Sequence, residues 1–185
     1  TGSVTVNRQP AVSNSTVLSG AIITAAKGSS AVVSLGKLGR VEIQEESTVT
    51  LRFSDSGIVA SVDAGRIRVA NSAGVATTVT TKNATYLGDA GQANNFLVEA
   101  ECSHSHVDTS VGIVTQREGS ADKQVVAGTT ATAGNLAQTG CKPCLRPDSA
   151  PGPAVGNWPW LLLLAAGAAG VGIFLGTRDD DKDFG

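Results

Sequence analysis

The sequence predicts an all-β domain, an antiparallel β-sandwich or roll of short strands, followed by a single C-terminal transmembrane α-helix. Three observations support this fold class. From Val4 to about Gly134 the chain consists of short runs rich in Val, Ile and Thr at intervals of about ten residues, which is typical of sandwiches and barrels. The same part of the chain shows no sustained helical period. Residues 158–177 are then uncharged and mostly apolar.

Several of the predicted strands alternate cleanly between apolar and polar residues. Val41 and Ile43 point one way while Glu42 and Gln44 point the other, so one face of the sheet is buried and the other is wet. Because aromatic residues make up only 4% of the chain, we expect a core of Val, Ile, Leu and Ala. The predicted strands are 31–35, 41–43, 48–53, 58–62, 66–70, 76–81, 95–101, 110–116 and 123–128, and the predicted turns are 27–30, 36–40, 54–57 and 62–65.

The chain divides into four parts by composition. Residues 1–134 form the predicted exported β domain, and residues 135–157 form a strap rich in Pro and Gly that carries a CxxC motif. Residues 158–177 are the predicted transmembrane helix, and residues 178–185 are an acidic tail. The chain contains no Met, which favours an N-terminus produced by removal of an export signal.

The charge distribution argues against two classes of partner. The tail holds two of the 14 Lys and Arg residues and four of the 16 Asp and Glu residues, so residues 1–157 carry 12 of each sign. A neutral body without a basic patch is not expected to bind nucleic acid. For the same reason, electrostatic adhesion to anionic lipid is not expected.

The 20 residues of 158–177 reach about 30 Å as a helix, which matches the hydrocarbon thickness of a bilayer. Trp158 and Trp160 stand at one end, where aromatic rings prefer the lipid headgroups. Small residues, which allow a second helix to approach closely, recur at every fourth position and form the predicted helix-packing face: Ala168, Gly172 and Gly176. We therefore expect both the lipid bilayer and integral membrane subunits as partners.

The β region resembles the periplasmic domain of the FecR family of iron-dicitrate-type sensors and anti-sigma regulators. The resemblance begins at "LSGAIITAAKGSSAVVSLGKLGRVEIQEESTVTLRF" and continues through "DAGRIRVA", "VTTKNATYLGDAGQANNFLVEA", "TSVGIVTQREG" and "KQVVAGTTATAG", covering roughly residues 16–134. It implies an exported all-β domain and no catalysis. The positions that carry the first part are Gly20, Ile23, Thr24, Ser30, Ala31, Leu35, Gly39, Ile43, Ser47 and Leu51.

The order of segments departs from that of signalling members of the family. In those members a cytoplasmic anti-sigma region comes first, a membrane helix follows it, and the periplasmic domain comes last. Here the apolar run follows the β domain, and we expect no anti-sigma region before it. This departure weakens the anti-sigma interpretation. Because the resemblance implies an exported β domain, we expect a single-span protein of the bacterial inner membrane, with the β domain in the periplasm and the C-terminus in the cytoplasm.

Cysteine and histidine residues provide the candidate site. The three cysteines, Cys102, Cys141 and Cys144, predict a structural disulfide, either Cys141–Cys144 or Cys102 to one of them. If residues 102–106 are extended, Cys102, His104 and His106 project from one face and could join the CxxC pair in a zinc site. The alternative, which we favour, is a polar strand end with solvated histidines, so no metal is expected.

Nothing in the sequence indicates an enzyme or a cofactor, because no GxSxG, Walker, HExxH or paired-carboxylate pattern is present. We expect a non-catalytic accessory subunit that docks its periplasmic β domain and helix onto a larger bacterial membrane complex, such as a photosynthetic or respiratory assembly. A FecR-like periplasmic sensor or signalling module is the first alternative. A redox or metal-binding protein that uses the Cys and His residues is the second.

Overall fold

The computed structural model describes residues 2–136, which form an all-β structure with one short 3-10 turn, η1 (Gly36–Leu38), and no α-helix. The chain divides into two units, residues 1–150 and 151–185, and the described residues belong to the first. No helix long and apolar enough to cross a bilayer occurs in residues 2–136. The predicted transmembrane run with Trp158, Trp160 and the helix-packing residues, most of the strap and the acidic tail lie outside the described residues.

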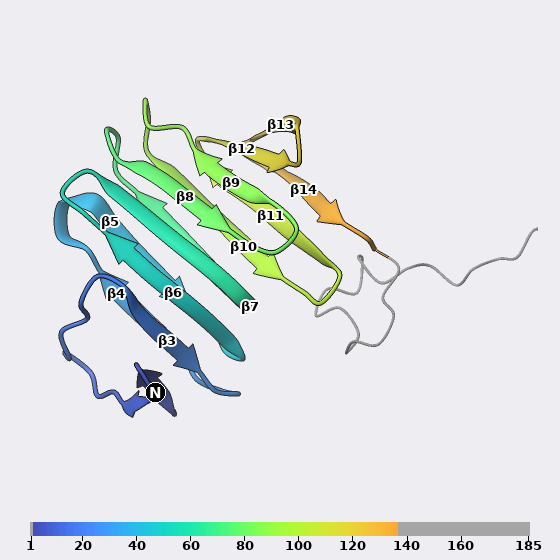
Figure 1. The fold of residues 1–185 in the computed structure, drawn as a ribbon. Helices are drawn as coiled ribbons and strands as arrows, with labels where there is room; N and C mark the ends of the chain where they lie inside the picture. Colours follow the sequence, from blue (N-terminus) through green and yellow to red (C-terminus); the bar gives the residue numbers. More distant parts are fainter. Residues whose placement is uncertain (1, 137–185) are drawn as a thin grey trace, which may run out of the picture. The chain divides into compact units, whose positions relative to one another are not determined.

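The strands form two sheets that face each other (Figure 1). Sheet A has the order β13 (Ala121–Val126), β12 (Ile113–Glu118), β9 (Thr85–Gly88), β8 (Ala76–Thr80), the first half of β7 (Gly57–Asn71), β6 (Ser47–Phe53), β3 (Ala21–Ala25), β1 (Val4–Val6) and β2 (Gln9–Pro10). Sheet B has the order β4 (Ala31–Ser34), β5 (Gly39–Ile43), the second half of β7, β10 (Asn94–Ala100), β11 (His104–Val111) and β14 (Thr129–Gly134).

Strand β7 joins the two sheets. Its residues 57–64 pair with β6 and β8 in sheet A, and its residues 65–71 pair with β5 and β10 in sheet B. Both of its ends lie near the start of β8, since Gly57 pairs with Ala76 and the side-chain amide of Asn71 donates to the Val75 carbonyl. The predicted turn at 62–65 is therefore found as a sharp bend inside one strand, not as a loop between two.

Gly65 makes this bend possible. Its φ of +91° lies in a region that favours glycine, and an added Cβ would stand 2.3 Å from the Ser47 hydroxyl oxygen and 2.6 Å from the Glu46 carbonyl oxygen. A side chain at this position would push β6 away from the bend. The Gly in "VDAG" was thus a correct signal of a special backbone conformation, although the ladder continues through it.

The core lies between the sheets and consists mainly of aliphatic side chains, as the composition predicts. Val49, Leu51 and Ile58 of sheet A face Ile43, Ile67 and the other inner side chains of sheet B, and all are fully buried. Two larger rings, Tyr86 and Phe96, fill the space that small side chains leave. Burial of this apolar surface is the main favourable contribution to folding.

Three details differ from the predicted strand pattern. The pair β7–β8 is parallel, whereas the other pairings among the described residues are antiparallel. The predicted strand 110–116 is two strands, because Gly112 (φ +84°) turns the chain from β11 in sheet B to β12 in sheet A. Sequence reasoning also did not predict β1, β2, β3, β9 and β14, which are short or rich in small residues.

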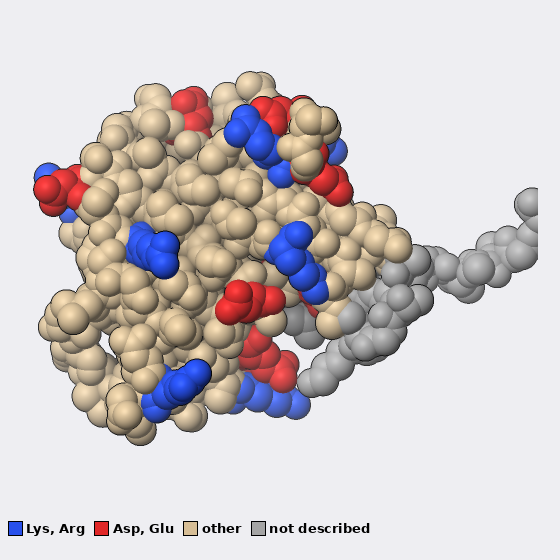
Figure 2. All heavy atoms as spheres, viewed as in Figure 1, with Lys and Arg blue, Asp and Glu red and all other residues tan. Residues whose placement is uncertain are grey.

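Charged side chains are scattered over the face seen in Figure 2, where Lys and Arg alternate with Asp and Glu and neither sign forms a continuous patch. Threonine side chains instead cover much of the outer face of sheet A, as at the paired positions Thr24 and Thr48. The described surface is therefore polar but poor in charge.

Candidate functional site

The candidate histidines lie on β11, in the hairpin that follows β10. His104 and His106 project from the same face of the strand, with ring centroids 4.8 Å apart and planes at 85°. Cys102 lies before the strand, in a turn that the Glu101 N–H closes by donating to the His104 carbonyl (2.9 Å). The spacing of two thus brings together the histidines, whereas Cys102 does not continue their row.

Both histidines are buried, so the interpretation of solvated histidines at a strand end is wrong. Their exposed fractions are 0% for His104 and 4% for His106. His104 Nδ1 lies 3.2 Å from the Ser103 hydroxyl oxygen, and His106 Nδ1 lies 3.0 Å from the Thr132 hydroxyl oxygen. β11 is an inner strand of sheet B, between β10 and β14, so the histidines do not lie at the margin of the sheet.

A row of polar side chains crosses four strands on the outer face of sheet B. In register, Glu99 of β10 is paired with Arg66 of β7 on one side and with His106 of β11 on the other, and His106 is paired with Thr132 of β14. Glu99 is fully buried, and Arg66 Nε lies 4.0 Å from its carboxylate. A buried carboxylate needs such partners, since leaving it unpaired would be costly.

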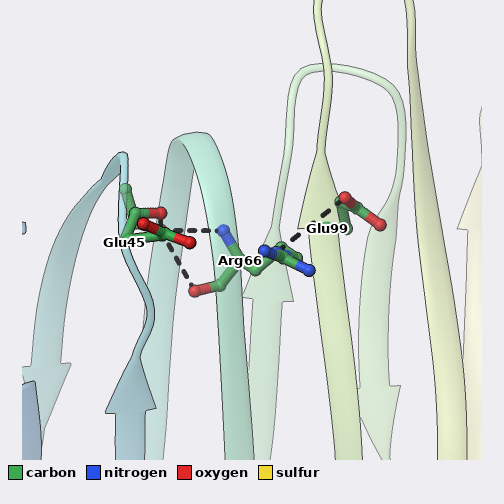
Figure 3. Close-up of polar contacts among 4 residues, drawn as sticks. Glu45, Arg66 and Glu99 are labelled. Carbon is green, nitrogen blue, oxygen red and sulfur yellow. Dashed lines mark hydrogen bonds and ion pairs between the residues drawn. The ribbon is translucent and has the colours of Figure 1, made fainter. Parts of the chain in front are cut away.

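The bend of β7 positions Arg66 for this contact (Figure 3). The Ser47 hydroxyl accepts a hydrogen bond from the Arg66 N–H (2.8 Å) and lies within donating distance of the Glu45 and Arg66 carbonyl oxygens. These bonds hold the backbone at the bend, and the Arg66 side chain then extends toward Glu99 on the neighbouring strand.

The inner face of β11 carries a second set of polar contacts. Tyr86 and Ser105 share a hydrogen bond between hydroxyls (2.7 Å), and the Thr81 hydroxyl donates to the Ser105 oxygen (3.1 Å). Burial of the phenol raises the pKa of Tyr86 to about 12. We call the residues on both faces the β11 polar cluster, and they are Arg66, Thr81, Tyr86, Glu99, His104, Ser105, His106 and Thr132.

Sequence reasoning missed most of this cluster. Glu99 occurs in the apolar stretch of residues 96–100, where a single polar residue gives no sign of its partner, and Tyr86 occurs in a mixed stretch that predicts no strand. Only the pairing of strands far apart in the chain brings Glu99 beside Arg66 and Tyr86 beside Ser105. Such a polar residue within a strongly apolar strand was the one available signal.

The metal and disulfide hypotheses have different outcomes. Within residues 2–136, no group of three or more His, Cys, Asp and Glu side chains is arranged to hold a metal ion. Cys102 is disulfide-bonded in the structure, and Cys141 and Cys144 lie outside the described residues. The partner of Cys102 therefore stays a prediction, which non-reducing peptide mapping can test.

Three hollows on the described surface are lined by few side chains that could take part in a reaction. One of about 650 Å³ is lined only by uncharged residues of β1, β3, β4 and the loop after β2. A second, of about 420 Å³, contains Arg40, and a third, of about 300 Å³, contains Glu45 and Arg66. Histidine, cysteine and tyrosine line none of these three.

Comparison with known proteins identifies the fold but no family. No protein-family model matches the chain, and no curated protein matches its sequence. Two crystal structures of a "putative anti-sigma factor" from Parabacteroides distasonis, at 2.50 and 1.65 Å resolution, are similar, each with a TM-score of 0.54 and 16% identity. The match covers 64% of this chain and 56% or 57% of those chains, so this chain corresponds to little more than half of them.

Proposed function

We propose that the β domain is a non-catalytic protein-binding domain of a membrane-anchored subunit, and that it docks onto a larger bacterial membrane complex. The observation that carries the proposal is that the histidines and the tyrosine do not line the hollow of about 650 Å³. The hollow of about 650 Å³ is lined by Val, Ala, Ile, Ser, Gly and Asn without a charged residue, which suits binding and not proton transfer. The histidines and the tyrosine instead contribute to the β11 polar cluster.

The proposed anchor is the apolar run at residues 158–177, with the β domain in the periplasm and the C-terminus in the cytoplasm. Support comes from the sequence, because 20 uncharged residues with two flanking tryptophans fit a single span. Small residues at 168, 172 and 176 would allow the helix to pack against a helix of another subunit. The photosynthetic or respiratory nature of the complex is part of the same proposal.

Native purification tests the proposal. The full chain, tagged at its C-terminus and extracted from its own membrane in mild detergent, is expected to migrate with other integral membrane subunits. A chain in which residues 158–177 are replaced by an unrelated polyleucine span is the matched control, because it keeps the anchor and removes the small-residue face. If the unmodified chain migrates as a free monomer, the docking proposal fails.

A second candidate function is a FecR-like periplasmic sensor. It is favoured by the fold shared with the Parabacteroides protein at a TM-score of 0.54. In this case deletion of the chain would change transcription of a small set of genes, whereas loss of a docked subunit would first change the composition of a membrane complex. Transcript analysis beside native electrophoresis of the same deletion strain separates the two functions.

A further inference from the structure

One lateral edge of the sandwich is open. Sheet A continues past β3 into β1 and β2, whereas sheet B ends at β4. Figure 1 shows β1, β2 and the loop that follows them at the same end of the molecule as β3 and β4. The hollow of about 650 Å³ lies at this edge, between β4 on one side and residues 11–15 on the other. We call it the edge groove.

The floor of the edge groove is the inner face of the sandwich. In register, Val4 is paired with Ala25 and Val6 with Ile23, so both valines point to the same side as the buried residues of β3. They are half-buried and pack against the core, as does Ala31 of β4. Val4 and Val6 therefore lack the facing strand of sheet B that covers the inner residues elsewhere.

The groove side of β4 offers free main-chain groups. Among the described residues, β4 pairs only with β5. The Leu35 N–H donates to the Gly39 carbonyl (2.9 Å), and in an antiparallel ladder hydrogen-bonded pairs alternate, so Ala31 and Val33 bond to β5. The N–H and C=O groups of Val32 and Ser34 then point away from β5, along the open edge.

The other side of β5 confirms this assignment. The Gln44 N–H donates to the Arg66 carbonyl (3.0 Å), which continues the ladder between β5 and β7. Bonds from β5 to β7 therefore start from the even-numbered residues of β5, and bonds from β5 to β4 start from the odd-numbered ones. Two unpaired donors and two unpaired acceptors on a short edge are a site where an extended chain can add.

We infer that the edge groove binds an extended segment of a partner protein as an additional strand of sheet B beside β4. The segment has apolar side chains at alternate positions, which cover Val4, Val6 and Val33, and no charge on that face. This inference rests on the proposed protein-binding function and gives it a location. The uncharged lining supplies the charge complementarity, because a charged side chain would be desolvated there without a partner.

The wall opposite β4 selects a free segment as the occupant. Residues 11–15 form this wall, held by a hydrogen bond from the Ala11 N–H to the Val4 carbonyl (2.9 Å) and a turn between Val12 and Ser15. The edge of a second folded domain would bring its own neighbouring strand into the space that the wall occupies. We therefore expect a single extended segment between the wall and β4, in contact with Val12, which lines the groove and is 77% exposed.

Peptide binding to the full chain in nanodiscs tests the inference, with binding to empty nanodiscs subtracted. The probes are fluorescent peptides of about nine residues, one with Val and Thr in alternation and one with the same composition but two central prolines, which cannot pair as a strand. The alternating peptide is expected to bind and the proline peptide is not. Absence of specific binding by the alternating peptide would overturn the inference.

Two substitutions locate the binding site. Val6→Asp places a charge in the floor, and Val32→Pro removes an outward N–H that β5 does not use; each is expected to weaken binding by at least about tenfold. Val59→Asp is the control, because Val59 is exposed on the outer face of sheet A. Circular dichroism and thermal melting confirm that each variant is folded. Equal binding by the folded groove variants and the unmodified chain would contradict the inference.

A photoreactive amino acid at position 32, compared with one at position 59, identifies the occupant in the native membrane. A crosslink to an extended segment of another protein supports the inference, whereas a crosslink to a second copy or to residues 137–185 of the same chain overturns it.

Native electrophoresis distinguishes failure of the groove inference from failure of the docking proposal. If the complex persists with both groove variants, the groove assignment fails and the docking proposal stands; if the unmodified chain is a monomer, the docking proposal fails and the peptide assay still decides the groove.

Discussion

The β11 polar cluster and the edge groove are built from the same kind of strand but differ in what surrounds them. β11 has hydrogen-bonded neighbours on both sides, and its polar side chains are buried and bonded to one another on both faces. In the described part of the chain β4 pairs with β5 alone, and the apolar side chains of β1 beside it are only partly buried. The comparison teaches that polarity alone does not mark a binding surface. In this domain the reactive polar side chains are bonded within the fold, and the partly exposed apolar residues form the surface that we propose for a partner.

The largest expected effect comes from the bend that brings Arg66 into the β11 polar cluster. Gly65→Val is expected to destabilise the domain by at least about 3 kcal/mol, because the new side chain overlaps Ser47 and the backbone is held at a positive φ. Urea unfolding followed by circular dichroism measures the change. Gly74→Ala is the control, since Gly74 has a similar φ of +83° with open space around it, and it should cost about 1 kcal/mol. Equal losses for both variants would show that the bend is not sterically tight.

The next effect is a loss of stability at high pH caused by Tyr86. Its pKa is raised from 10.0 to about 12 by burial, so the folded domain holds the neutral phenol more tightly than the unfolded chain does. The stabilisation is complete below pH 10 and falls as the pH rises toward 12, by about 3 kcal/mol in total.

Ultraviolet titration measures this pKa directly, because Tyr86 is the only tyrosine in the chain. Urea midpoints between pH 9 and 12 measure the change in stability, and Tyr86→Phe is the control that removes the tyrosine contribution while the lysines still titrate. A titration midpoint near the ordinary value of 10 would contradict the burial of this hydroxyl among Ser105 and Thr81.

A smaller effect is expected from the contact between His106 and Thr132. A double-mutant cycle with His106→Ala and Thr132→Val should give a coupling energy of about 1 kcal/mol, the net contribution of one hydrogen bond. The same cycle with Thr130→Val is the control, since Thr130 lies on the same strand and is exposed. A coupling indistinguishable from zero would remove His106 from the cluster.

The smallest effect is expected at the edge groove. Val12→Ser should change the free energy of unfolding by no more than about 0.5 kcal/mol, because the side chain is already largely in water. Thermal melting measures this value, and Val49→Ser in the core is the matched control with an expected loss of several kcal/mol, about 2–4. If Val12→Ser destabilised the domain as much as the core substitution, the groove would be part of the core and not a free surface.

The sequence was sufficient to predict the all-β domain, because period-two alternation and turn residues are local signals, whereas the transmembrane helix stays a prediction. Positions such as Val41 and Ile43 are buried where the alternation places them, and the turns at 27–30 and 54–57 separate strands as predicted. The failures are informative for the same reason. Gly65 was predicted in a turn and Gly112 inside the strand 110–116, but each moves the chain from one sheet to the other, and only the long-range pairing reveals which sheet follows.

The candidate site was less predictable than the fold. The spacing of His104 and His106 correctly placed them on one face, but a period of two shows neither that this face is covered nor that Thr132 of β14 lies beside His106. Likewise, Val4 and Val6 carry no sequence signal of an open groove. Within residues 2–136, no strand of sheet B lies beyond β4 to cover them, and the sequence of β1 alone does not show this.

The continuity of β7 has a consequence for how errors in strand alignment are prevented. Sheets A and B share hydrogen bonds through this strand, and it pairs with β6 and β8 in one and with β5 and β10 in the other. A slip of one residue along β7 would turn its buried side chains outward in both sheets at once. A misaligned β7 would therefore lose buried apolar contacts in both sheets. The bend at Gly65 fixes the alignment of both halves of the strand.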